Sequence, residues 1–262
     1  MIFDTNTRPD LKLMAVMAAA SSDAYDEDSQ CDAELAEAGL TGIAHVDQPA
    51  AHAVLADMIW NGAPVQIVDT RGTEFTQAIR ATRESLSARL EAIKSCYANV
   101  DQTKAPFPTG GYVPRGYFEG ARTIFDALRP KLALNRPVIF TGHSQGAVCG
   151  LLEAALAKFA GFDASFYVFA PPKPGDDDFA ASIADVPGFA FERWRDFATT
   201  HDVFTGWTVK PRPYWWLHDG TMTLTTGRPG INESVEDHDD QKYKADTAAF
   251  AEKGWPSEGE QQ

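Results

Sequence analysis

The sequence predicts a single α/β domain in which a mainly parallel or mixed sheet is covered by helices on both faces. Short apolar runs rich in strand-forming residues alternate with longer amphipathic stretches along the chain. No internal repeat and no linker rich in Gly or Ser divides the 262 residues, so we expect one domain over residues 1–262. Because 44% of the residues are hydrophobic, the chain can fill a large core, which excludes a disordered or fibrous protein.

The first half of the chain predicts a helix, a hairpin and a second, longer helix. Leu11–Ala20 follows Asp10, a favourable N-cap, and this favours an amphipathic helix over the apolar core of a secretory signal. Turn residues separate Ala53–Trp60 from Val65–Thr70, which predicts two strands joined by a hairpin. Thr76–Ala98 has apolar residues near helical spacing opposite a polar face, which predicts a helix.

The second half predicts strands and helices in alternation. Phe118–Leu128 and Ala147–Phe159 have helical patterns, whereas Val138–Thr141 is too short for a helix between its breakers and predicts a buried strand. The remaining expected elements are strands at Ser165–Ala170 and near Arg193–Thr200, a final helix at Gln241–Glu252, and a frayed polar tail over residues 254–262.

The charge and cysteine content limit the partners of the protein. Lys and Arg number 23 against 37 Asp and Glu, a formal charge of −14, so we expect no nucleic acid partner and no docking on anionic membranes. No apolar run has the length of a membrane span, so we expect no stable membrane insertion. Cys31, Cys96 and Cys149 fit neither a disulfide framework nor a paired metal-ligand pattern, which with the missing signal predicts free thiols and a cytoplasmic location.

A candidate nucleophile lies where the predicted strand Val138–Thr141 meets the predicted helix that starts at Ala147. Gly142–Gly146 matches the pattern G-x-S-x-G, with Ser144 at its centre. A serine on so tight a turn adopts strained backbone angles, and glycines prevent collisions with the neighbouring strand and helix. The helix N-terminus beside the hydroxyl favours a developing oxyanion, so the motif predicts an acyl-transfer nucleophile.

A serine nucleophile requires a histidine base and an acid, which follow it in the order Ser, Asp, His in α/β hydrolases. His201, His218 and His238 are the candidate bases, because His45 and His52 precede Ser144 in the chain. His201 adjoins Asp202, and adjacent residues of an extended segment point in opposite directions. The residues alone leave the choice among the three open.

Four ordered motifs resemble successive signatures of the fungal-type class 3 lipases, over about Val65 to Tyr243. These motifs are Ile67–Thr73, Gly116–Phe118, Phe140–Ala147 and Tyr167–Asp176. The resemblance implies an α/β-hydrolase fold and a serine carboxylester hydrolase (esterase, lipase or phospholipase type) that needs no metal or organic cofactor.

The resemblance also implies roles for individual residues. It assigns Ser144 as nucleophile, Asp202 as the acid, and His238, with an aromatic residue a few positions on, as the base. It places a non-catalytic histidine at His218. The usual Pro after Val203 is missing, so Asp196 remains the alternative acid.

The same resemblance assigns the oxyanion hole and a lid. Thr73, through its N–H and hydroxyl, and the N–H of Gln145 are the expected oxyanion donors, and residues 74–117 correspond to the lid. In that interval only Phe107, Tyr112 and Tyr117 could form an apolar lip. We therefore expect modest-sized or phospholipid-like ester substrates and weak activation by lipid interfaces.

The alternatives to this function are an amidase or peptidase with the same triad and a non-catalytic binding module. Most such relatives are secreted, so export by a route other than a signal peptide stays open.

Overall fold

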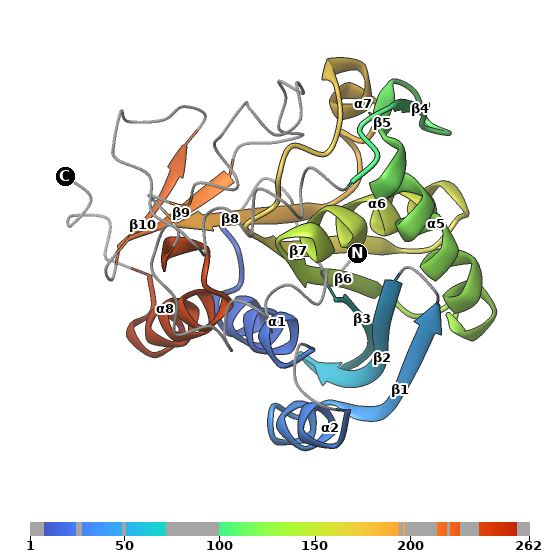
Figure 1. Cartoon of the computed structure of the whole chain (residues 1–262). Coiled ribbons are helices and arrows are strands. Elements are labelled where there is room, and N and C mark those ends of the chain that lie inside the picture. Colours follow the sequence, from blue (N-terminus) through green and yellow to red (C-terminus); the bar gives the residue numbers. More distant parts are fainter. Residues whose placement is uncertain are drawn as a thin grey trace.

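The computed structural model describes residues 8–24, 28–48, 51–71, 100–193, 196, 214–218, 221–225 and 236–255. Its centre is an eight-stranded sheet in the order β1-β2-β3-β6-β7-β8-β9-β10 (Figure 1). The strands are β1 (Thr41–Gln48), β2 (Ala51–Trp60), β3 (Ala63–Thr70), β6 (Val138–His143), β7 (Ala164–Phe169), β8 (Gly188–Arg193), β9 (Tyr214–His218) and β10 (Thr221–Thr225). The strands from β3 to β9 are parallel to one another. At the two sides of the sheet the pairing is antiparallel: β1 pairs with β2, β2 with β3, and β10 with β9. The predicted mixed, mostly parallel sheet is confirmed.

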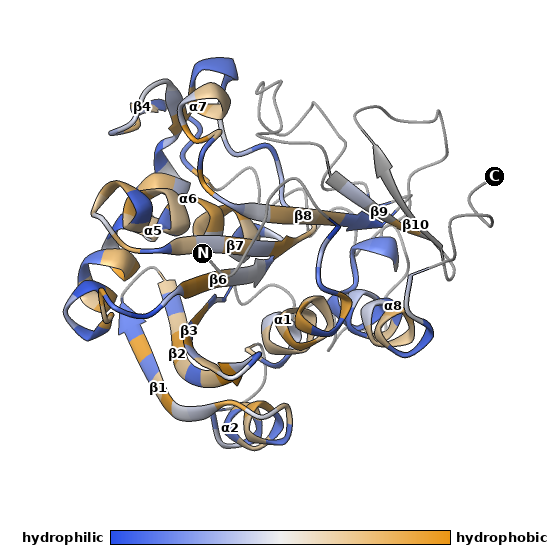
Figure 2. Ribbon diagram, turned by 180° about the vertical axis from the view of Figure 1, so that it is seen from behind, coloured by the Kyte–Doolittle hydropathy of each residue, from blue (hydrophilic) through white to orange (hydrophobic). Residues whose placement is uncertain are grey.

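Helices cover both faces of this sheet (Figures 1 and 2). The helices are α1 (Leu11–Asp23), α2 (Asp28–Glu37), α5 (Arg115–Leu128), η1 (Arg129–Lys131), α6 (Gln145–Phe159), α7 (Asp177–Ser182), η3 (Glu236–His238) and α8 (Asp240–Lys253). None of the helices in the described part of the chain is long and apolar enough to cross a membrane.

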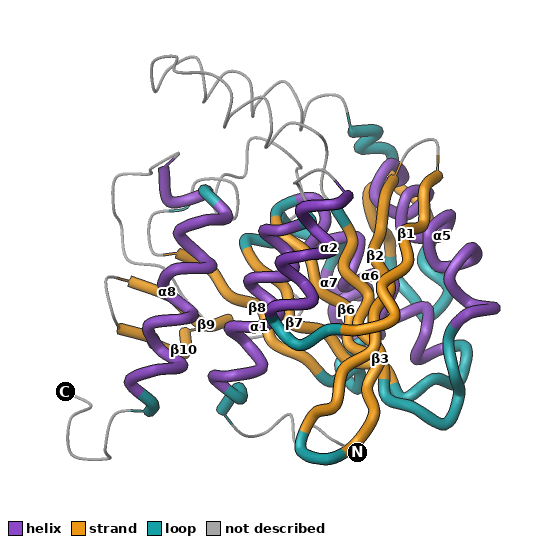
Figure 3. Tube along the Cα trace, turned by 90° about the horizontal axis from the view of Figure 1, so that it is seen from below, coloured by secondary structure: helices purple, strands orange, loops and turns teal. Residues whose placement is uncertain are grey.

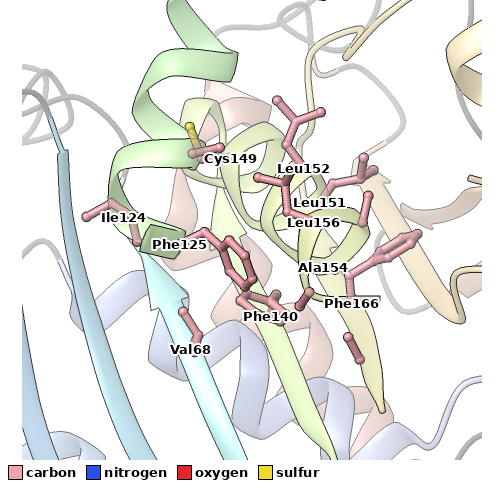
Figure 4. Packing of buried hydrophobic residues seen from close by; sticks show 14 of the residues in the cluster. Val68, Ile124, Phe125, Phe140, Cys149, Leu151, Leu152, Ala154, Leu156 and Phe166 are labelled. Atoms are coloured by element: carbon pink, nitrogen blue, oxygen red, sulfur yellow. The ribbon is translucent and has the colours of Figure 1, made fainter. Parts of the chain in front are cut away.

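Two apolar clusters fill the space between the sheet and its helices. Val68 and Phe140 face α5 and α6, where Figure 4 shows them beside side chains of both helices. Ile67 and Ile139, the next residues along the same strands, face the opposite side, where α1 and α8 pack. Because the central strands are buried on both faces, their sequences read as continuous apolar runs.

The N-terminal helix and the hairpin form where the sequence predicts them, although α1 is buried nearly all round and not amphipathic, with only Lys12 exposed. The Oδ1 atom of Asp10 accepts hydrogen bonds from the backbone N–H groups of Lys12 and Leu13 at 3.0 and 3.1 Å, which makes it the N-cap of α1. β2 and β3 pair through a two-residue turn at Asn61 and Gly62, both with positive φ. This conformation matches the twist of a tight hairpin.

Several elements differ from the expectations. β1 was not expected, and a small second sheet, β4 (Lys104–Pro106) with β5 (Tyr112–Pro114), lies within the expected lid, residues 74–117. β8 ends at Arg193, where the sequence-based strand was expected to begin. The predicted helix Thr76–Ala98 and residues 74–99 of the expected lid lie outside the described residues, as does the tail beyond residue 255.

Asp69 and Glu153 are two of the buried carboxylic acids, and burial disfavours their charged forms. Asp69 of β3 is 2% exposed, and neither of its oxygens has a hydrogen-bond partner among the described residues. Burial raises the pKa of Asp69 to about 8. Burial likewise raises the pKa of Glu153 on α6 to about 8, although Glu153 accepts a hydrogen bond of 2.7 Å from the Thr70 hydroxyl.

We expect Asp69→Asn to become more stable relative to the wild type as the pH rises. The folded protein keeps the Asp69 proton up to about pH 8, whereas the unfolded chain loses it near pH 4, so this residue costs stability increasingly across that window. The amide does not titrate. Between pH 5 and pH 9 the free energy of unfolding of the variant should therefore rise, relative to that of the wild type, by at least about 1.4 kcal/mol, the value of one pKa unit. Urea unfolding at pH 5, 7 and 9 measures the difference.

Asp163→Asn is the matched control, because Asp163 is exposed. Its stability should follow that of the wild type at every pH. If Asp69→Asn and the wild type keep a constant stability difference from pH 5 to 9, Asp69 does not carry a buried proton.

Candidate active site

Ser144 lies at a sharp turn between the end of β6 and the start of α6. Its backbone angles, φ 58° and ψ −122°, lie outside the regions that residues with a side chain ordinarily occupy. The N–H of Ser144 donates to the carbonyl of Phe169 at 3.0 Å, and its own carbonyl accepts from Ala147 at 3.1 Å. These contacts with β7 and α6 hold the strained turn, a feature typical of functional sites.

The expected need for glycine at the turn is visible at Gly142. A Cβ atom there would lie 2.5 Å from the carbonyl carbon and oxygen of Gly146 and 2.8 Å from the carbonyl oxygen of Thr70. At Gly150, one turn further along α6, a Cβ would lie 2.8 Å from the carbonyl oxygen of Thr141. Glycine therefore lets α6 approach β6 closely enough to place Ser144 at the helix N-terminus.

His238 joins the serine to a buried carboxylate. Its Nε2 lies 2.8 Å from Ser144 Oγ, and its Nδ1 lies 2.9 and 3.0 Å from the two carboxylate oxygens of Asp196. His238 is 7% exposed and Asp196 is fully buried. With Nδ1 donating to the carboxylate, Nε2 is left to accept the serine proton.

The acid in contact with His238 is Asp196, the alternative, and this corrects the choice of Asp202. Asp202 and His201 lie outside the described residues. The difference follows from the strand boundary: β8 ends at Arg193, and the Asp196 N–H donates to the carbonyl of Arg193 at 3.1 Å. An acid that follows a strand ending at residue 193 falls at 196, whereas a strand extended to residue 200 would have placed it at 202.

The structure distinguishes His238 from His218 by their positions in the fold. The structure brings His238 to Ser144, as predicted. The backbone of His218 lies at the end of β9 and pairs with Thr221 of β10, and its side chain is outside the described set.

Tyr243 of α8 holds the carboxylate, a contact that the sequence did not predict. Its hydroxyl donates to Asp196 Oδ2 at 2.7 Å and accepts from the N–H of Arg193 at 2.7 Å. Burial raises the pKa of Tyr243 well above its ordinary value, and the Asp196 carboxylate adds to this, so the phenol stays protonated. Tyr243 was expected only as an aromatic residue after the base.

His143 packs against two aromatic rings of the site. Its ring centroid lies 4.9 Å from that of His238 and 5.5 Å from that of Tyr243. The side chain is 2% exposed. His143 therefore forms one wall against which the His238 imidazole is held.

Replacing Tyr243 with Phe should lower kcat by about 10-fold or more, because a hydrogen bond to a charged group contributes about 1.5–3 kcal/mol. The carboxylate would lose one of its fixed donors, so the pH profile of kcat/KM should also shift. The matched control is Tyr167→Phe in β7, whose hydroxyl accepts from the Asp10 N–H at 3.4 Å. Equal kcat and pH profiles for Tyr243→Phe and the wild type would exclude a positioning role.

Of the two expected oxyanion donors, the structure describes one. The N–H of Gln145 is the first of α6, and the first N–H groups of a helix have no intrahelical acceptor. Gln145 directly follows Ser144, so this positive helix end adjoins the hydroxyl. Thr73 lies outside the described residues.

Comparisons with known proteins identify the family of the chain. The sequence model of the family described as Lipase (class 3) matches residues 68–203, more than half of the chain. Among the curated proteins no match was found.

Solved lipase structures share the fold. The native Rhizomucor miehei lipase propeptide complex is 18% identical with a TM-score of 0.64, covering 88% of this chain and 80% of that one. The Rhizopus microsporus var. chinensis lipase is 17% identical with a TM-score of 0.61, covering 89% and 87%. A triacylglycerol lipase whose catalytic centre is formed by a serine protease triad is 17% identical with a TM-score of 0.58, covering 87% and 91%.

The sheet order and these structural matches define a protein of the α/β-hydrolase fold. The chain belongs to the class 3 lipase family. It is therefore a hydrolase of the lipase and esterase type.

Proposed function

We propose that the protein is a serine carboxylester hydrolase that cleaves carboxylic or lipid esters through an acyl-enzyme. The observation that carries this proposal is the continuous contact from Ser144 Oγ through His238 to Asp196, at 2.8 and 2.9 Å. A nucleophile, a base and an acid that orients the base are the three groups that acyl transfer requires. The triad of a structurally similar triacylglycerol lipase supports the same chemistry.

The first half-reaction transfers the acyl group to the serine. His238 Nε2 takes the Ser144 proton as Oγ attacks the ester carbonyl, and the negative charge moves to the carbonyl oxygen. The N–H of Gln145, with Thr73 as the family resemblance implies, stabilises this oxyanion, and each fixed donor contributes about 3 kcal/mol. Asp196 stabilises the protonated imidazole, which then gives its proton to the departing alkoxide and releases the alcohol.

The second half-reaction returns the serine. His238 removes a proton from water, the resulting hydroxide attacks the acyl carbonyl, and the collapse of the intermediate releases the acid and reprotonates Ser144. All proton transfers pass through Nε2 of His238, which is 2.8 Å from Ser144 Oγ.

The described end of the expected lid favours modest-sized or phospholipid-like esters over a strongly interface-activated triglyceride lipase. Of its three aromatic residues, Phe107 and Tyr117 are 5% and 0% exposed and belong to the core beside α5, so they offer no apolar lip. Tyr112 is 45% exposed. The formal charge of −14 also opposes unaided docking on anionic lipid.

A substrate panel tests the proposal. It contains nitrophenyl esters of increasing acyl length, a dispersed triglyceride, a phospholipid and a nitroanilide, each assayed with the wild type and with Ser144→Ala. We expect turnover of the shorter esters, no steep rise in rate when an ester forms an interface, and loss of turnover in the variant. Cleavage of the anilide at a comparable rate would indicate an amidase, and the absence of any turnover would indicate a binding module.

A further inference from the structure

A second group of titratable side chains lies at the β1 edge of the sheet, where α2 packs on the β1–β2 hairpin (Figure 3). His45 and Asp47 are two residues apart on β1, so they share one face, and His52 of β2 pairs with Asp47 across the strands. Asp28 and Asp32 are four residues apart on α2, so they also share a face. The fold thus gathers two histidines and three carboxylates from three elements.

The outer nitrogen of each imidazole faces a carboxylate. His45 Nε2 lies 2.8 Å from Asp32 Oδ1, and His52 Nδ1 lies 2.5 Å from Asp47 Oδ1. A carboxylate accepts hydrogen bonds only, so each outer nitrogen carries the proton. The inner nitrogens, His45 Nδ1 and His52 Nε2, then both present lone pairs to each other at 3.3 Å. Facing lone pairs repel, so this arrangement calls for a positive charge between them.

The distances fit a metal ion at that position. Two imidazole nitrogens bound to one tetrahedral Zn²⁺ at about 2.0–2.1 Å lie about 3.3–3.4 Å apart, and the inner nitrogens are 3.3 Å apart. Asp28 Oδ1 lies 3.7 Å from His45 Nδ1, and one ligand atom from each of Asp28, His45 and His52 lies within 4.8 Å of the others.

The surrounding charge also favours a cation. Among the residues that the structure describes, Asp28, Asp32 and Asp47 make ion-pair contacts only with the two histidines. With neutral imidazoles, these three negative charges have no positive partner among the described residues, in a chain that already carries −14. A carboxylate behind each histidine is the usual arrangement around a metal-bound imidazole, because it fixes the tautomer and raises the basicity of the ligand.

We propose that Asp28, His45 and His52 bind one divalent cation of the Zn²⁺ class, with Asp32 and Asp47 as the residues that orient the imidazoles. Asp28 is 68% exposed at its side chain, so the ion is reached from solvent and a water molecule completes its coordination. The ion joins α2 to β1 and β2 and involves none of the residues around Ser144. Its effect is therefore on stability, since a ligand that binds only the folded chain raises the melting temperature with its concentration.

Calorimetric titration of chelator-treated full-length protein with ZnCl₂, together with thermal melting, tests the proposal. We expect one site per chain that is lost in His52→Gln, and a melting temperature that rises with free Zn²⁺ and falls again with chelator. Asp32→Asn and Asp47→Asn should bind 10–100-fold more weakly, as is typical for groups behind a ligand. Asp163→Asn, an exposed and distant matched control, should bind as the wild type does.

Two further readouts keep the test decisive. Nitrophenyl ester turnover of His52→Gln should equal that of the wild type, which shows that the variant folds. Co²⁺ added to the wild type should give the intense visible absorption of a tetrahedral site. A wild-type protein that binds no Zn²⁺, or His52→Gln binding it as tightly as the wild type, overturns the proposal and leaves a proton shared by the two histidines as the explanation.

Discussion

Replacing Asp196 with Asn is expected to lower kcat by about 10⁴-fold, the order found when the buried acid of a serine protease triad becomes an amide. Asp196 is fully buried, and both its oxygens lie within 3.0 Å of His238 Nδ1. The amide has no charge to stabilise the imidazolium, and its NH₂ group favours the tautomer that carries the proton on Nε2. That tautomer cannot accept the Ser144 proton.

The sequence-based alternative provides the matched control. Asp202→Asn makes the same chemical change six residues further along, and it should retain kcat within a few-fold of the wild type. Burst and steady-state kinetics with a nitrophenyl ester measure both variants. If Asp202→Asn is the inactive variant and Asp196→Asn is active, the assignment of the acid from the structure is wrong.

Replacing His238 with Ala is expected to remove nearly all turnover, by about 10⁴–10⁶-fold, because the residues of a triad act as a unit. His238 Nε2 is 2.8 Å from Ser144 Oγ, and without the imidazole the hydroxyl keeps its proton at neutral pH. Substrate binding should change much less, since the acyl site is not altered. Active-site titration separates the loss of acylation from the loss of folded protein.

His218→Ala should retain most of the wild-type activity. His218 is the other candidate that follows the nucleophile within an aromatic segment, and its backbone belongs to β9. An inactive His218→Ala protein that is folded by circular dichroism, together with an active His238→Ala protein, would reverse the assignment of the base.

The nucleophile was predictable from the sequence because its signal is local. Gly142 and Ser144 lie within one strand-to-helix turn, and glycine is needed there because a Cβ atom at Gly142 would lie 2.5 Å from the backbone of Gly146. His238 was identified by the family resemblance and not by its spacing. The central strands were predictable for a related reason, because burial on both faces produces continuous apolar runs.

The acid was not predictable with the same certainty because its position depends on where β8 ends. Gly188–Arg193 is buried throughout, whereas the sequence pattern had favoured a strand that begins near Arg193, where β8 ends. Tyr243 reaches Asp196 from 47 residues away, and no local pattern reports such a contact. β1 was missed for a different reason: only Val46 of its residues is buried, so the strand shows little apolar alternation.

Labelling with a fluorophosphonate probe tests the central claim that Ser144 is an activated nucleophile. The Ser144 oxygen displaces fluoride from phosphorus only when its proton has been taken up by a base, so the probe reports the contact between Ser144 and His238 directly. We predict that peptide mass spectrometry of the wild type finds one adduct, on Ser144, and that Ser144→Ala finds none while His238→Ala is labelled far more slowly. A folded wild-type protein that remains unlabelled, or that carries the adduct on another residue, would contradict the account.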